Sequence, residues 1–203
     1  MGWAFPDLAE RQRWDLGCAS FGHLGQGVGE VACAHRIRDW SAFIDFDAGS
    51  KEALDGALAE GRGVVFVTGR VGNWELMGRG LCLLGYPITA IGKKSYDPRL
   101  TRLLTDFRKQ GRVHTLWRGE AKIIEKMMAV IGKGEIMGLL IDQDTRVPSV
   151  FVPFFGRLAS TSTAPAMLAR KTGAAMICCF NHRRADQGLR LSVQRSPLSG
   201  AAE

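Results

Sequence analysis

Residues 64–80, VVFVTGRVGNWELMGRG, join an apolar run to a glycine turn and then to a segment of helical character. Gly69 and Gly72 permit unusual backbone angles, and the side chain of Asn73 can cap the helix that follows. Glu75 then falls in the first helical turn, where the helix dipole favours a carboxylate. Such strand-to-helix junctions often hold active sites. Glu75 is therefore either a simple complement to the dipole or a catalytic group.

This turn does not have the spacing of a nucleotide-binding loop. The stretch GRVGNWEL contains neither G-x-x-x-x-G-K-[ST] nor G-x-G-x-x-G after the apolar run. A nucleotide phosphate cradle is therefore not favoured.

Two further polar clusters follow apolar runs in the same way. GKKSYDPR carries Lys93 and Lys94, and DQDTR carries Asp142 and Asp144. Since the carboxyl ends of parallel strands meet at one edge of a sheet, we expect these clusters to lie near the glycine turn. Taken alone, the two aspartates also fit the metal and nucleotide-sugar motif of a glycosyltransferase.

Alternating helical and strand-like segments must position these clusters. The expected helices are 50–63, 73–85, 97–111, 119–134 and 160–173, and the expected strands are 64–69, 86–94, 112–117, 135–142, 174–180 and 189–197. Ser50, Asp97 and the pair Thr161 and Thr163 are the expected helix caps. The alternation predicts an α/β fold with a mainly parallel central sheet flanked by helices. No repeat or linker divides residues 1–203, so we expect a single domain.

Two apolar regions have more than one interpretation. Residues 7–40 have apolar side chains at mostly helical spacing, which predicts one or two amphipathic helices that either pack on the domain or touch a bilayer surface. Phe151, Phe154 and Phe155 line an acyl-chain or membrane-facing groove, or else pack in the core.

The net charge indicates which classes of partner the chain can bind. The net charge is +7 and the pI is about 9.5, which favours lipid phosphates, an anionic bilayer or an acidic carrier protein. The arginines are dispersed and no RNA-binding motif or zinc finger is present, so nucleic acid is not favoured. The five cysteines lack C-x-x-C spacing and support neither a zinc site nor a disulfide framework. From the residues given, we expect neither an export signal nor a membrane-spanning segment.

The motifs together resemble the bacterial lipid A biosynthesis acyltransferases, the lauroyl and myristoyl transferases. Residues 72–75, GNWE, match the end of the family's His-Phe-Gly-Asn-Trp-Glu block. Later blocks follow in the family's order: Lys93 and Lys94, DPRLTRLLTDFRKQG, GLLIDQD, VFVPFFGRLASTST and AMLARKTGAAMI. SFGHLGQGVGE is similar to the family's Asn-Leu-Gly segment near the N-terminus. The resemblance covers about residues 7–183.

This resemblance implies a glycerolipid acyltransferase-like fold and an acyl transfer reaction. In the family, a histidine acts as general base on an acceptor hydroxyl and an acidic residue orients it, while an acyl thioester on acyl carrier protein is attacked. Arg70 stands at the histidine position, with Glu75 as the acidic partner. The resemblance assigns substrate binding to Asn73, Lys93, Lys94, Arg102, Arg108, Asp142 and Asp144. It implies no cofactor and no metal.

The resemblance also implies the setting of the reaction. The acceptor would be a lipid A precursor or related glycolipid, the donor acyl carrier protein or a similar thioester, and the location the cytoplasmic face of the inner membrane. Family members generally begin with a membrane-anchoring helix and continue past the last residue of this chain. A fragment without either part is therefore expected.

Arg70 leaves several interpretations of the site. Arginine stays protonated in proteins and cannot serve as a base. Arg70 then binds a substrate phosphate or pairs with Glu75, and the chain is either a slow enzyme or a glycolipid-binding or membrane-binding pseudoenzyme. Alternatively, His114 on the third expected strand replaces the missing base.

Overall fold

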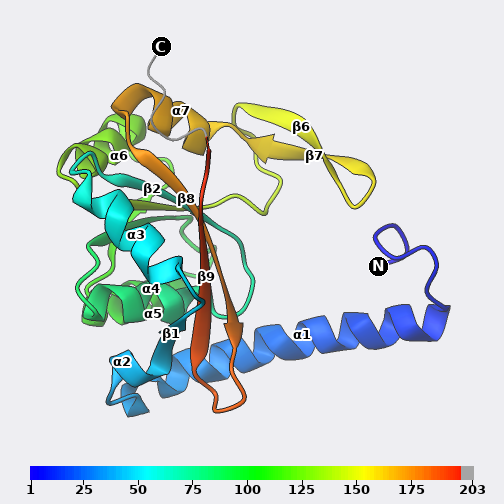
Figure 1. Cartoon of the computed structure of the whole chain (residues 1–203). Coiled ribbons are helices and arrows are strands. Elements are labelled where there is room, and N and C mark those ends of the chain that lie inside the picture. Colours follow the sequence, from blue (N-terminus) through cyan, green and yellow to red (C-terminus); the bar gives the residue numbers. More distant parts are fainter. Residues whose placement is uncertain (198–203) are drawn as a thin grey trace.

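A computed structural model describes residues 1–197 and contains one seven-stranded sheet and one separate hairpin (Figure 1). From edge to edge, the large sheet runs β1 (Ile44–Phe46), β9 (Leu189–Arg195), β8 (Ala175–Arg183), β2 (Val64–Thr68), β5 (Ile136–Leu140), β3 (Ile88–Gly92) and β4 (His114–Trp117). The five strands from β8 to β4 are parallel. β9 is antiparallel to β8, and β1 is parallel to β9. The predicted α/β fold with a mainly parallel sheet is confirmed.

Helices cover both faces of the large sheet. The helices of the domain are α2 (Trp40–Phe43), α3 (Ser50–Ala59), α4 (Trp74–Leu83), α5 (Pro98–Gln110), α6 (Ile123–Gly132) and α7 (Ala164–Thr172). Val64 and Phe66 of β2 pack in a cluster with α3, α4 and α5. Val65 and Val67 pack in a second cluster with α6 and α7. Every residue of β2 is buried, as expected for a parallel strand between two helical layers.

The helix caps agree only partly with the sequence. The Asp97 carboxylate accepts from the Arg99 backbone N–H at 2.9 Å and caps α5, as predicted. The prediction for Ser50 is wrong, because Gly49 occupies the cap position and the Ser50 hydroxyl accepts from the Val193 backbone N–H. At the start of α7 the Ala164 backbone N–H donates to the hydroxyl of Ser162, one residue before the cap position, at 3.2 Å.

The two predicted threonine caps have other partners or places. Thr163 holds the position before α7, but its hydroxyl donates to the Pro148 carbonyl. Thr161 lies within strand β7 (Arg157–Ser162). The prediction that the Thr161 and Thr163 side chains cap α7 is therefore wrong.

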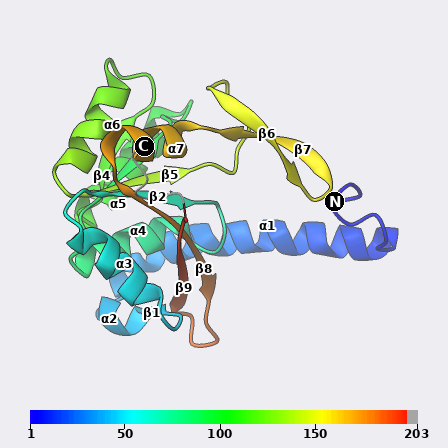
Figure 2. The same cartoon turned by 45° about the horizontal axis from the view of Figure 1, so that its top comes forward.

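A long N-terminal helix and a hairpin extend from the same side of the domain (Figures 1 and 2). Helix α1 (Glu10–Cys33) continues into a short 3₁₀ helix, η1 (Ala34–Arg36), and contains no buried residue. The amphipathic helix is confirmed, but packing of its apolar residues on the domain is wrong for those before Val31. Trp14, Phe21, Leu24 and Val28 are all exposed. No helix within residues 1–197 is both long and apolar enough to cross a membrane.

The hairpin consists of β6 (Ser149–Phe154) and β7. Phe151, Phe154 and Phe155 lie on it and are 69%, 65% and 55% exposed, so their predicted core packing is wrong. The hairpin tip meets the N-terminal segment: the Phe5 and Phe155 rings lie 5.6 Å apart, and the Arg157 guanidinium lies 4.3 Å from the Trp3 ring. The sequence did not predict this hairpin or strand β1.

The turn between β2 and α4 requires glycine at position 72. Gly72 has a φ of +64°, and a Cβ there would lie 2.2 Å from Oδ1 and 2.4 Å from the backbone oxygen of Asn181 on β8. The left-handed angle and the close approach therefore both exclude a side chain.

Gly72→Ala should lower the free energy of unfolding by about 1–3 kcal/mol, the usual cost of a side chain forced into a rare backbone region. Denaturant unfolding would measure the change. Gly56→Ala is the matched control, because Gly56 lies inside α3 with open space around it, and it should gain about 0.5–1 kcal/mol. Equal stability of Gly72→Ala and the native chain would contradict this description of the turn.

Candidate active site

Arg70 faces Asp142 across the carboxyl edge of the sheet. β2 and β5 pair with Thr68 opposite Leu140, and continuing that register places residue 70 opposite residue 142. The Arg70 backbone N–H donates to Asp142 Oδ2 at 2.6 Å, and its guanidinium Nη1 donates to Oδ1 at 2.5 Å. The predicted meeting of the glycine turn with the DQD cluster is therefore confirmed for Asp142.

The Arg70 guanidinium also lies 5.9 Å from the centre of the Trp74 ring. The Arg70 and Asp142 side chains keep 33% and 35% of their surface exposed. Water therefore weakens their ion pair, and an incoming anion can reach the guanidinium. Arg70 can bind negative charge here but cannot accept a proton.

Glu75 is paired with Arg108 and not with Arg70. Arg108 Nε donates to Glu75 Oε2 at 2.9 Å, and Nη2 donates to Oε1 at 2.6 Å. The two side chains are only 9% and 15% exposed, for Arg108 and Glu75 respectively. Such a bidentate pair fixes the carboxylate in position and occupies both of its oxygens. Pairing of Arg70 with Glu75 is therefore wrong.

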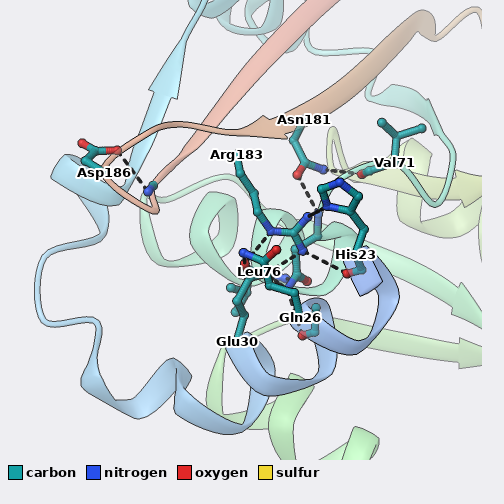
Figure 3. Close-up of polar contacts among 11 residues, drawn as sticks. His23, Gln26, Glu30, Val71, Leu76, Asn181, Arg183 and Asp186 are labelled. Carbon is teal, nitrogen blue, oxygen red and sulfur yellow. Dashed lines mark hydrogen bonds and ion pairs between the residues drawn. The ribbon is translucent and has the colours of Figure 1, made fainter. Parts of the chain in front are cut away.

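Asn73 belongs to a polar cluster with Glu30 of α1 and Asn181 of β8, two residues that Figure 3 labels. Its Oδ1 accepts from the Leu76 backbone N–H at 3.1 Å, so the predicted cap of α4 is confirmed. Its Nδ2 donates to Glu30 and to the Gly27 carbonyl. Asn73 is 3% exposed. These contacts favour a structural role for Asn73 over the substrate-binding role expected from the sequence.

Glu30 of α1 is the acid of this cluster. Burial acts to raise its pKa, but hydrogen bonds from Arg183, Asn73 and Gln26 outweigh burial and lower the pKa. Glu30 is therefore a carboxylate at neutral pH. The contact between α1 and the turn is not apparent from the sequence, because Glu30 and Asn73 are 43 residues apart along the chain.

The remaining predicted site residues are distributed around this edge. Lys93 and Lys94 are exposed directly after β3, and the Lys93 ammonium lies 5.3 Å from the Tyr96 ring. Asp144 is exposed two residues beyond Asp142. Arg102 is exposed on α5, where its nearest acid is Asp106 at 4.0 Å. The structure therefore brings Arg108, and not Arg102, together with Glu75.

His114 cannot replace the missing base. It is the first residue of β4, whose carboxyl end is Trp117. Because β4 is parallel to β3, His114 lies at the sheet edge opposite the glycine turn. The prediction that His114 replaces the base is wrong, because it rested on distance along the sequence and not on the direction of β4.

Asp142 of the Asp-Gln-Asp segment is paired with an arginine. The Asp142 carboxylate receives the Arg70 cation, and within residues 1–197 no group of three or more His, Cys, Asp or Glu is arranged to hold a metal ion. These contacts do not support the metal chemistry of the glycosyltransferase alternative.

An apolar pocket of about 540 Å³ opens beside the DQD segment. It lies between α6, α7 and the ends of β3 and β5, and its apolar lining includes Ile91, Ile123, Ile124, Met127, Leu139, Ile141 and Met167. Arg118, Gln143 and Thr145 supply polar groups. Sequence reasoning missed this pocket and expected an apolar groove at the hairpin phenylalanines, none of which lines it. The only available signal was the apolar stripe of residues 123–131.

The sequence matches the family described as bacterial lipid A biosynthesis acyltransferase over residues 1–198. It is 29% identical over 175 residues to a phosphatidylinositol mannoside acyltransferase of Mycobacterium tuberculosis (strain ATCC 25618 / H37Rv), covering 83% of this chain and 55% of the relative. It is 28% identical over 189 residues to a lipid A biosynthesis lauroyltransferase of Escherichia coli (strain K12), covering 90% and 59%.

A phosphatidylinositol mannoside acyltransferase of Mycolicibacterium smegmatis is 30% identical over 122 residues, covering 59% of this chain and 40% of the relative. The matched region is thus between two fifths and three fifths of each relative's length. The family match extends across almost all of this chain and includes the turn, both ion pairs and the pocket. The chain belongs to the bacterial lipid A biosynthesis acyltransferase family.

Proposed function

We propose that the chain carries the site of an acyltransferase that moves a fatty acyl group from a thioester, such as that of acyl carrier protein, to a hydroxyl of a lipid A precursor or related glycolipid. The apolar pocket beside the polar edge carries this proposal. Ile141 and Gln143 line the pocket, and Asp142 between them holds Arg70. The pocket can therefore bind an apolar acyl chain while Arg70, beside the pocket, binds a charged head group.

Acyl transfer makes two demands on this edge. The acceptor hydroxyl loses a proton as its oxygen attacks the thioester carbonyl, and the carbon–sulfur bond then breaks to release the thiol. Arg70 can stabilise the negative oxygen that forms on the carbonyl, or a phosphate of the acceptor. Neither Arg70 nor the Arg108-bound Glu75 is a free base. Loss of a general base costs about 10²- to 10⁴-fold in rate, so slow turnover through positioning is expected.

The two ion pairs also favour a second candidate, a glycolipid-binding pseudoenzyme. Two acidic groups of the site have arginine partners, Asp142 with Arg70 and Glu75 with Arg108. A site of this kind holds phosphate and sugar groups without moving a proton. The two candidates differ in whether the thioester is cleaved.

Surface charge and exposed apolar groups support the proposed donor and location. Lys93, Lys94 and Arg102 are exposed and fit an acidic carrier protein or lipid phosphates. The hairpin and the N-terminal segment expose Trp3, Phe151, Phe154 and Phe155 beside Arg157. This combination of aromatic and basic residues fits an anionic bilayer surface, which supports a peripheral position at the cytoplasmic face of the inner membrane.

Arg70→His should raise acyl transfer to a lipid A precursor by about 10²-fold or more. The imidazole would stand where Arg70 now meets Asp142, whose carboxylate can orient it. Release of thiol from a lauroyl thioester of acyl carrier protein would measure the rate. Arg70→Gln is the control and should show no gain, and Asp142→Asn added to Arg70→His should reverse the gain. A folded Arg70→His variant without increased transfer would favour the pseudoenzyme.

Ile124→Asp should weaken binding of a fluorescent lauroyl analogue by about tenfold, which corresponds to about 1.4 kcal/mol. Ile124 lines the pocket but is 38% exposed, so a charge there should disturb the ligand more than the fold. Ala129→Asp, at an exposed position of the same helix, is the control and should bind normally. Equal affinity of the two variants would exclude this pocket as the acyl-chain site.

Replacing Phe154 and Phe155 together by serine should reduce cosedimentation with vesicles that contain anionic phospholipid, because two aromatic anchors are lost. Leu103→Ser is the control, since Leu103 is also exposed but lies on α5, away from the hairpin. If the double variant and the control bind vesicles like the native chain, the hairpin is not the bilayer contact.

A further inference from the structure

Polar groups attach helix α1 to the domain beside the partly buried Val31, which packs against the core. The helix contains no buried residue, and its carboxylate Glu30 accepts from Arg183 of β8 through Nε at 2.5 Å and Nη2 at 3.0 Å. The two side chains are only 13% and 19% exposed, for Arg183 and Glu30 respectively. Gln26 donates to the same carboxylate at 3.0 Å, and Figure 3 shows these groups gathered between α1 and β8. A shielded ion pair of this geometry fixes both partners.

The same cluster holds the glycine turn from two sides. Asn181 of β8 accepts from the Asn73 backbone N–H at 2.8 Å and donates to the Val71 carbonyl at 3.0 Å. Asn181 and Arg183 are two residues apart on one strand, so their side chains lie on the same face. β8 therefore holds the turn through Asn181 and holds α1 through Arg183.

Asn73 joins these contacts, and its amide has one orientation that satisfies them all. Oδ1 must face the Leu76 backbone N–H, which can only donate. Nδ2 must then find acceptors, and both of those it contacts are on α1: Glu30 Oε2 at 2.7 Å and the Gly27 carbonyl at 3.1 Å. The Glu30 carboxylate thus stabilises the amide orientation that caps α4.

We propose that Glu30 is a positioning residue for the site, acting on Arg70 and Glu75 through the acceptor that it offers to Asn73. Arg70 lies three residues before Asn73, and Glu75 lies two residues after it in the helix that Asn73 caps. A change in the Asn73 amide therefore alters the turn and the start of α4 together. The proposal depends on the proposed function only in treating this turn as the site, since the contacts exist without substrate.

Three variants separate the acceptor from the ion pair. Glu30→Ala removes both. Glu30→Gln keeps an acceptor oxygen for Asn73 but removes the charge that pairs with Arg183. Combining Glu30→Arg with Arg183→Glu restores an ion pair but turns a donor toward Asn73. Asp15→Asn, which breaks only the exposed Arg11–Asp15 pair of the same helix, is the control.

Hydrogen exchange of the Leu76 amide in the free protein reports the cap, and thermal unfolding reports the ion pair. Glu30→Ala should speed Leu76 exchange by at least about tenfold and lower the melting temperature. Glu30→Gln should lower the melting temperature but leave Leu76 protected. The charge-swapped variant should recover the melting temperature and leave Leu76 unprotected. Asp15→Asn should leave Leu76 exchange as in the native chain.

Three results would overturn the proposal: native exchange in Glu30→Ala, fast exchange in Glu30→Gln, or full protection in the charge-swapped variant. In the last case the ion pair alone orders the turn. These measurements need no substrate. Absence of acyl transfer in every Arg70 variant would therefore remove the proposed function and leave this test intact.

Discussion

The parallel pairing of β2 with β5 determines the geometry of the whole site. Their register sets Thr68 opposite Leu140, and two residues later it sets Arg70 opposite Asp142. Both strands are buried between two helical layers, where a slip by one residue would turn their side chains to the wrong faces. The hydrophobic core thus fixes the position of two exposed charges. Asp142 then holds the glycine turn, and this turn determines where α4 begins.

The site contains two arginine–carboxylate pairs, and their surroundings differ. The Arg108–Glu75 pair is shielded and bidentate, and it joins α5 to α4. The Arg70–Asp142 pair is partly exposed at the edge of the sheet. A shielded pair is costly to break because it would leave a buried charge, whereas an exposed pair exchanges readily with water or another anion. Arg108 therefore has the character of a fixed part of the scaffold, and Arg70 that of a group available to ligand.

Local features of the fold were readable from the sequence, and the features that depend on strand order were not. The buried run before the turn, the Asn73 and Asp97 caps and the alternation of helices and strands follow from neighbouring residues. The partner of Arg70 depends on which strand lies beside β2, which the chain order does not reveal. The sequence also does not reveal the direction of each strand in the sheet. The strand that contains His114 is predicted correctly, but His114 lies at the end of that strand away from the site.

The longest-range contacts were the least predictable. Glu30 lies 43 residues before Asn73, and Arg183 lies 153 residues after Glu30. Their clustering arises because β8 runs beside β2 and reaches beyond it to α1. Glu30, which lies in the predicted amphipathic segment, therefore supports the cap of the helix that carries Glu75.

The identity of residue 70 is largely independent of the structure that surrounds it. Asp142 accepts from the backbone N–H of residue 70 at 2.6 Å, a contact that any residue except proline can make. Asn181 of β8 holds the turn through the Val71 carbonyl and the Asn73 N–H, which are also backbone groups. Glu75 is held by Arg108 without any contribution from residue 70. The scaffold thus keeps an acid beside position 70 whatever side chain stands there, and the chemistry of the edge depends on that one side chain.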